Sequence, residues 1–198
     1  MSENNVDWGS QLFGGKLLKK ALSMPAELLI VLWGWAQLIN YARYFAVRVS
    51  MFSYLTDKVL EYLTSGIAVL VFLFTVNYLW LHRVQLKDGI GRQVLIVWLA
   101  FILSMVMTNL MLNNVMHTVV FELQHALFML LTSGAMLATS LLIQSRFMRF
   151  GAVFFALAAF AASYFSLKYQ MALEAIGWLV AFVLPGHALL HEALKKRT

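Results

Sequence analysis

Five polar residues near the ends of apolar runs have the types and spacing of a metal site. His187 and His191 stand four residues apart in the last apolar stretch, so on a helix both imidazoles share one face, and Glu192 follows them. His82 and Asp88 lie in an earlier basic loop, residues 82–92. Imidazole and carboxylate groups bind zinc and other divalent metals. These five residues are therefore a candidate metal site, in which Glu192 would act as a base near the ion.

The order of His82, Asp88, His187 and His191 resembles the zinc ligands of the membrane hydrolases that include the alkaline ceramidases and the adiponectin receptors. In that superfamily a histidine ending the second span, an aspartate near the third and a His-x3-His pair bind zinc. The resemblance implies a metal-dependent intramembrane hydrolase. The chain departs from the pattern: the family has seven spans with the pair at the start of the last, and Tyr78 stands where the family has a serine.

Pro185 and Gly186 give the last stretch a second interpretation. Proline removes one helical hydrogen bond and glycine loosens the turn, so the span can end there. His187 to Lys196 would then form an amphipathic helix on the membrane surface, and its histidines would bind no ion. We favour this interpretation over the metal site.

A second polar group, His117, Glu122 and His125, opens the fourth apolar run (HTVVFELQH). Glu122 and His125 have the Glu-x-x-His spacing that occurs in the metal sites of helical bundles. Ionisable side chains within a span are costly in lipid, so we expect them to face protein or water. Histidine changes charge near neutral pH, which predicts a polar or proton site here; a structural hydrogen-bonded pair is the alternative.

Apolar helices must position these side chains. The chain has 198 residues, of which 62% are hydrophobic and 12% charged, and its mean hydropathy of +0.77 is too high for one water-soluble core. The basic residues stand between apolar runs and do not alternate with aromatic residues, so no nucleic acid is expected as a partner despite the net charge of +6. The lipid bilayer is the expected surrounding of the chain.

Six apolar runs are long enough to be membrane helices, since a bilayer needs about 20 apolar residues. They cover residues 26–46, 63–81, 94–112, 116–143, 150–167 and 171–191, approximately. Tyr44 to Tyr62 is expected to lie at the outer interface or to extend the first span, and Asn113-Asn114 to form a turn. The fourth run exceeds the length that a bilayer needs, so it is expected to tilt or project.

Lysine and arginine residues outside these runs predict the orientation, because such residues gather on the cytoplasmic side. Eleven lie on the side that holds both termini and four on the other. We expect an all-α, polytopic membrane protein with six helices in one bundle, with both termini cytoplasmic, in the inner membrane of a bacterium. Residues 1–25 would form an interfacial amphipathic segment, 26–192 the membrane domain and 193–198 a basic cytoplasmic tail.

Three classes of function remain. Long uninterrupted helices and short loops favour an integral membrane subunit, scaffold or assembly factor that packs against partner membrane proteins or copies of itself. A metal-dependent hydrolase is the alternative, and a small transporter or channel that uses the polar residues of the fourth run is a further one. Both prolines lie near the ends of runs, whereas transporters often have helices interrupted at the midplane.

Overall fold

The computed structural model describes residues 25–49, 53–83, 89–116 and 121–196, and its regular structure there is entirely helical. The helices are α2 (Glu27–Arg48), α3 (Tyr54–Leu81), α4 (Ile90–Met116), α5 (Phe121–Leu142), α6 (Arg146–Ala162), α7 (Leu167–Trp178), the π-helical turn Leu179–Val183 and α8 (Leu184–Lys195). The prediction of an all-α chain is confirmed for these residues.

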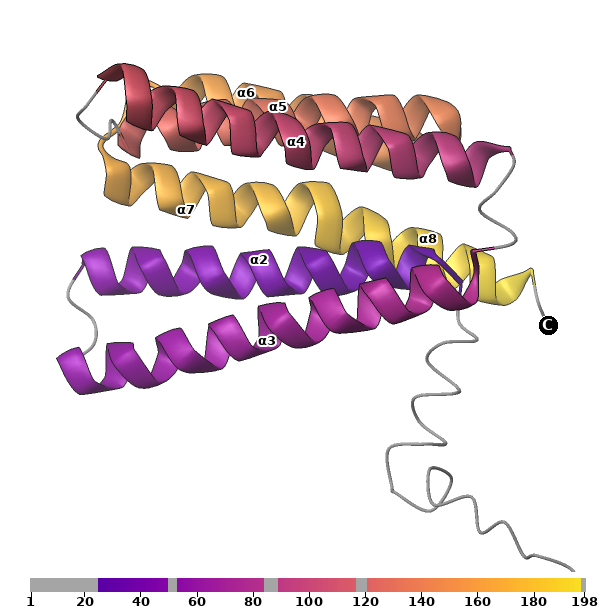
Figure 1. Cartoon of the computed structure of the whole chain (residues 1–198), viewed down its shortest axis with the longest axis horizontal. Helices are drawn as coiled ribbons and strands as arrows, with labels where there is room; N and C mark the ends of the chain where they lie inside the picture. The colour runs from indigo at the N-terminus through magenta and orange to yellow at the C-terminus, as the bar shows by residue number, and fades with distance from the viewer. Residues whose placement is uncertain (1–24, 50–52, 84–88, 117–120, 197–198) are drawn as a thin grey trace, which may run out of the picture.

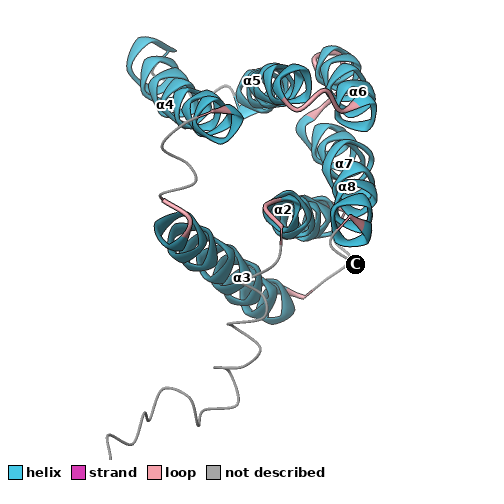
Figure 2. Cartoon of the chain, turned by 90° about the vertical axis from the view of Figure 1, so that its right-hand side faces the viewer, coloured by secondary structure: helices cyan, strands magenta, loops and turns pink. Residues whose placement is uncertain are grey.

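The helices lie side by side and alternate in direction along the chain, except that α7, the π-helical turn and α8 continue in one direction (Figure 1). Viewed end on, they trace an open arc from α4 through α5, α6, α7 and α2 to α3 (Figure 2), and consecutive helices of this arc pack together. We call the end of the bundle that holds Glu27 and Lys195 the terminal end, and the end that holds Arg48 and Tyr54 the far end. The start of α2 and the end of α8 therefore lie at the same end.

In the described part of the chain, four helical segments are long and apolar enough to cross a membrane, which indicates a membrane protein. They are Tyr54–Leu81, Ile90–Leu112, Leu123–Leu142 and Leu167–Lys195. The last of these joins α7, the π-helical turn and α8. Many large apolar side chains on the outer surfaces of these segments are exposed, as contact with lipid hydrocarbon requires.

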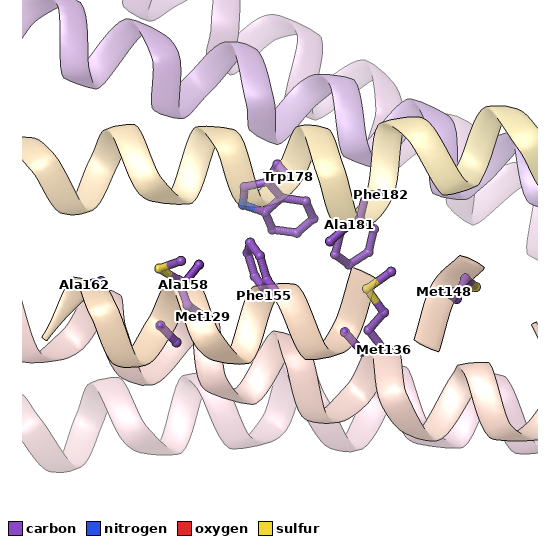
Figure 3. Packing of buried hydrophobic residues seen from close by; sticks show 11 residues of the cluster. Met129, Met136, Met148, Phe155, Ala158, Ala162, Trp178, Ala181 and Phe182 are labelled. Atoms are coloured by element: carbon purple, nitrogen blue, oxygen red, sulfur yellow. The ribbon is translucent and has the colours of Figure 1, made fainter. Parts of the chain in front are cut away.

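The core of the bundle lies between α5, α6 and α7, where methionine, alanine and aromatic side chains interdigitate (Figure 3). Phe155 of α6 is fully buried and stands edge-on to Trp178, with ring centroids 5.6 Å apart. Phe182 lies 4.4 Å from Trp178, centroid to centroid, and Met129 and Met136 pack from α5. Because lipid tails are as apolar as these side chains, close packing is what holds such helices together in a membrane.

Glycines bring α6 into close contact with α7 and with the π-helical turn that follows it. A Cβ atom at Gly177 would overlap the Phe155 ring, and one at Gly151 would lie 2.8 Å from the carbonyl oxygen of Ala181. Gly134 of α5, by contrast, has nothing within 4 Å of a Cβ position. Small residues at helix contacts allow the backbones to approach, so Gly177 and Gly151 are packing residues.

Pro185 explains the π-helical turn that precedes it. Proline has no N–H group, and its ring clashes with the carbonyl four residues earlier, which here belongs to Ala181. The helix widens instead, and the N–H of Leu184 donates to the carbonyl of Leu179, five residues back. The chain therefore continues as α8, and the prediction that the helix ends at the Pro-Gly pair is wrong.

Serine side chains mark where α3 and α6 begin. The Ser53 hydroxyl accepts a hydrogen bond from the Thr56 N–H at 3.3 Å, and the Ser145 hydroxyl accepts one from the Met148 N–H at the same distance. Each satisfies a backbone donor that has no partner inside the helix. Gln144, with φ of 55°, reverses the chain just before α6.

Two predicted boundaries are wrong. Because Ser53 provides its cap, α3 begins at Tyr54, so residues 54–62 belong to this helix and form no separate interfacial one. Residues 44–48 extend the first helix, which was the alternative expectation for this part of the segment. Asn113 and Asn114 lie within α4, since the surrounding apolar residues continue the helix through them. The next helix, α5, is described from Phe121 to Leu142, and residues 117–120 of the expected fourth span lie outside the described part of the structure.

An ion pair fastens the start of α3 to the end of α2. The buried Arg43 guanidinium places Nη2 and Nε at 2.7 and 3.0 Å from Oδ1 of Asp57. Glu61 lies 3.7 Å from Nη2 and pairs with Lys58 at 2.8 Å. Burial of a charge requires such pairing, so these residues join the two helices at the far end of the bundle.

Candidate functional site

A buried carboxyl–imidazole pair connects α5 and α7. Nδ1 of His125 lies 3.0 Å from Oε2 of Glu174, and the two side chains are 17% and 3% exposed. Tyr41 of α2 completes the group, because its ring stands edge-on to the imidazole, with ring centroids 5.9 Å apart. Three helices thus supply one polar cluster, which we call the Glu174 cluster: Tyr41, His125 and Glu174.

Helix periodicity on α7 explains why the carboxyl points inward. Gln170, Glu174 and Trp178 follow one another at intervals of four residues, and all three are buried on the face that packs against the bundle. The Gln170 Nε2 donates to the carbonyl of Phe165 at 2.9 Å. Packing of Trp178 in the core therefore fixes the rotation of α7 that buries Glu174.

Two polar atoms flank the carboxyl along this face of α7. Oε1 of Gln170 and Nε1 of Trp178 are buried and have no hydrogen-bond partner among the described residues. Each is one helical turn from Glu174, one a free acceptor and the other a free donor. Buried polar groups of this kind need a partner, which a water molecule can supply. The face of α7 is thus a polar line within an apolar bundle.

The chemistry available at the Glu174 cluster is proton binding and exchange. An ionised Glu174 accepts from Nδ1–H of His125, whereas a protonated carboxyl can donate to a neutral imidazole. An ionisable group inside a membrane bundle is costly, and burial with a named partner is the usual mark of a functional role.

The predicted site in the fourth run is only partly described. His125 faces protein, as expected, and its partner is Glu174 of α7. Glu122 belongs to α5, but its side chain lies outside the described part of the structure, as does His117. The Glu122–His125 hypothesis therefore stays a prediction.

The histidines predicted for a metal site have protein partners or lie on the surface. His82 ends α3, where its Nδ1 lies 2.9 Å from the carbonyl oxygen of Tyr78 and its ring stacks on the Tyr78 ring. Nε2 of His187 accepts a hydrogen bond from Nε1 of Trp35 at 3.1 Å. His191 is exposed on α8.

These histidines share the terminal end of the bundle but form no ion-binding group with other described residues. Glu192 is exposed on α8, and Asp88 lies outside the described residues. Within the described ranges, no three histidine, aspartate or glutamate side chains come together as a metal site would require. The zinc prediction, which includes Asp88, stays a prediction.

Sequence reasoning did not find Glu174 and Tyr41 as partners of His125. The distance of each residue from the end of its helix could have identified them. His125 is four residues from the start of α5, and Glu174 is seven residues from the start of α7. Tyr41 is seven residues before the end of α2. All three of these helix ends lie at the far end of the bundle (Figure 1). At 1.5 Å per residue, the three side chains had to lie at similar depths.

Comparison of the chain with protein-family models, with curated proteins and with solved structures gives no match.

Proposed function

We propose that the protein is an integral membrane subunit or assembly factor that packs against partner membrane proteins through α3 and α4. The unequal burial of the apolar helices supports this proposal. In the most apolar stretches, 0% of α4 and 11% of α3 is buried in the bundle, against 44% of α5 and 50% of the α7–α8 segment. The two helices at the ends of the arc (Figure 2) therefore leave most of their apolar surface outside the bundle.

Polar side chains on the outer surfaces of α3 and α4 favour contact of these helices with protein over contact with lipid. Asn77 of α3 and Ser104 and Asn109 of α4 are exposed within apolar stretches. The Asn109 Oδ1 accepts from Nε2 of Gln124 at 3.3 Å, which fastens α4 to α5. Such side chains associate membrane helices, with about 1 kcal/mol or less for each hydrogen bond.

The proposal includes six membrane crossings, with both termini in the cytoplasm of a bacterium. The shortest of the six proposed crossings, α6, has 17 residues and spans about 26 Å, close to the hydrocarbon thickness of a bilayer. The start of α2 and the end of α8 share one end (Figure 1), as an even number of crossings requires. Basic residues gather at that end: Arg83, Arg92, Arg146, Arg149, Lys195 and Lys196.

Photo-crosslinking in native membranes tests the proposal. A photoreactive amino acid is placed at Leu70 of α3, at Leu103 of α4 and, as a control, at Leu157 of α6; these side chains are 67%, 62% and 64% exposed. We expect protein adducts from the first two positions and lipid adducts alone from Leu157. Lipid adducts alone at Leu70 and Leu103 would exclude a partner-binding subunit.

The Glu174 cluster supports a second candidate function, a proton-linked transporter. The observation that supports this function is the buried Glu174 carboxyl, which is paired with an imidazole. Oε1 of Gln170 and Nε1 of Trp178, both without a hydrogen-bond partner among the described residues, flank this carboxyl. Purified protein in vesicles that contain a pH-sensitive dye would show proton uptake, and Glu174→Gln would abolish it. Equal uptake by the wild-type protein and Glu174→Gln would exclude this function.

A further inference from the structure

Gln170 links the exposed connection between α6 and α7 to the buried polar line on α7. The four residues of this connection, 163–166, are all exposed. Nε2 of Gln170 donates to the carbonyl oxygen of Phe165 in the connection at 2.9 Å, although Gln170 itself is only 1% exposed. Its other polar atom, Oε1, is buried and has no hydrogen-bond partner among the described residues. One end of this carboxamide is thus fastened to the exposed connection, and the other end is a free acceptor inside the bundle.

The Glu174 carboxyl lies much closer to the far end of the bundle than to the terminal end. It is seven residues from the start of α7, or about 10 Å, and 21 residues before Lys195 at the end of α8, or about 31 Å. Gln170 stands between Glu174 and the far end, one helical turn before the carboxyl. Cβ atoms four residues apart on a helix are about 5–6 Å from each other, a gap that one water molecule can bridge. Gln170 therefore occupies the short route between Glu174 and the solution.

Apolar side chains fill the bundle between Glu174 and the terminal end. Phe155 is fully buried, and the Phe182 ring lies 4.4 Å from the Trp178 ring, centroid to centroid (Figure 3). Buried hydroxyl groups occur on this side too, but each donates to a backbone carbonyl: Thr132, Ser133, Thr139 and Ser140. Among the described residues, the one buried side-chain acceptor without a partner is Oε1 of Gln170, on the far-end side. The polar route from Glu174 thus leads to the far end.

A water molecule between Gln170 and Glu174 suits both side chains. Water donates two hydrogen bonds, and the carboxamide oxygen and the carboxylate both accept. A carboxylate accepts several hydrogen bonds, so Glu174 can bond to this water and to Nδ1–H of His125 at the same time. Buried polar atoms that lack a protein partner are where ordered water is found in proteins. Oε1 of Gln170 therefore marks a position for water beside the carboxyl.

Two other titratable groups face Glu174 among the described side chains. His125 of α5 is bonded to the carboxyl, and Tyr41 of α2 stands edge-on to that imidazole. Helix α6 also packs against α7, but its charged residues, Arg146 and Arg149, lie in its first turn at the terminal end. The protonation of Glu174 is thus coupled to His125 and Tyr41 and to no charge on α6.

We propose that Glu174 exchanges its proton with the solution at the far end, through water held between the Gln170 and Glu174 side chains; this inference rests on the proton-linked function proposed for the Glu174 cluster. A proton from the solution enters this water, which gives one hydrogen to the carboxylate. The water is then unchanged, and Glu174 has gained one proton. In the proposed topology the far end is external, so the cluster takes up protons from outside the cell.

Carbodiimide labelling tests the side of access. A membrane-permeant carbodiimide reacts with protonated carboxyl groups, and mass spectrometry identifies the modified residue. The protein is placed in vesicles with a single orientation, and the pH is lowered on one side at a time. We expect the labelling of Glu174 to rise several-fold when the pH falls at the far end and to stay constant when it falls at the terminal end.

Two other carboxyl groups of the chain report the pH of each side in the same experiment. The Glu61 side chain is 40% exposed near the far end, and Glu192 is exposed near the terminal end. The labelling of each should follow the pH of its own side. Labelling of Glu174 that follows the terminal-end pH, both sides equally, or neither side would overturn the inference.

Substitution of Gln170 tests whether its carboxamide holds the water. Infrared spectroscopy of perfused vesicles follows the carbonyl band of the protonated Glu174 carboxyl, which Glu174→Gln removes. After a rapid fall in the far-end pH, this band is expected to grow several-fold more slowly in Gln170→Leu than in the wild type. Met171→Leu is the matched control, because Met171 is also buried and has no N–H or O–H group in its side chain. Equal rates in Gln170→Leu and the wild type would overturn the role of Gln170.

The outcomes separate this inference from the proton-linked function. If Glu174 follows the far-end pH but the vesicles take up no protons, the route of access is correct and the transport function is wrong. If the vesicles take up protons but Glu174 follows the terminal-end pH, the transport function is retained and the route is overturned.

Discussion

Nδ1 of His125 lies 3.0 Å from Oε2 of Glu174, and this contact joins two helices that are separated by 49 residues in the chain. The pair is enclosed by Tyr41 and by the aromatic packing of Trp178. It is therefore both a connection between α5 and α7 and a buried site where a proton can bind.

Removal of the Glu174 carboxyl is expected to destabilise the protein. Glu174→Leu leaves His125 buried without its partner, and breaking a buried pair in this way costs about 3 kcal/mol or more in soluble proteins and less in membranes. Glu174→Gln retains an acceptor and should cost less. Unfolding in a mixed-detergent titration measures both. Glu192→Gln is the control, because the Glu192 carboxylate is exposed on α8. If Glu192→Gln lowers stability as much as Glu174→Leu does, the role of the pair is contradicted.

Gly177→Ala is expected to lower stability by about 1–3 kcal/mol, because the added methyl group overlaps the Phe155 ring and the core is already packed. Gly134→Ala adds the same atom to open space and should be neutral or slightly stabilising. Thermal denaturation of the two variants in one detergent compares them directly. If both variants melt at the same temperature, α6 and α7 do not pack as described.

The Arg43–Asp57 pair is expected to couple α2 and α3. In a double-mutant cycle of Arg43→Ala and Asp57→Ala, the coupling energy should lie at about 0.5–3 kcal/mol. The buried guanidinium explains this expectation, since its two nitrogens share one carboxylate oxygen. Arg48→Ala with Asp57→Ala is the control, because Arg48 is exposed. Additive effects of Arg43→Ala and Asp57→Ala would show that the ion pair is not formed.

Reporter fusions that flank α6 test the number of crossings. Fusions after Ser145 and after Ser163 stand at the two ends of the 17-residue helix, which is the shortest candidate crossing. We expect a cytoplasmic reporter signal at Ser145 and an external one at Ser163. Signals on the same side would show that α6 does not cross, and the prediction of six spans would then be wrong.

The lengths of the apolar runs predicted the helices well because they depend on local sequence. The sequence predicted the all-α fold and the approximate position of each helix, but it did not predict where the helices begin and end. Ser53 starts α3 earlier than hydropathy indicates, and Asn113 and Asn114 continue α4 despite their polarity. Pro185 was expected to end a helix, whereas a π-helical turn absorbs its missing hydrogen bond.

The candidate site depends on which helices are neighbours, and spacing along one helix cannot show this. The sequence drew attention to His125 and to the nearby Glu122. The partner in the described structure is Glu174, because α5 and α7 both pack against α6 and meet at the far end. Equal depth in the membrane would have limited the choice of partners, but the order of the arc comes only from the tertiary structure.

Photolabelling of native membranes measures directly whether protein covers α3 and α4. A small membrane-partitioned carbene precursor labels side chains that face lipid, and mass spectrometry identifies the labelled residues. We predict weak labelling of Leu73 and Leu103 in native membranes and strong labelling of Leu157 and Phe160 on α6, although all four side chains are more than half exposed in the single chain. Strong and equal labelling of all four residues would show that lipid alone surrounds the bundle, and would contradict the proposed role as a packing subunit.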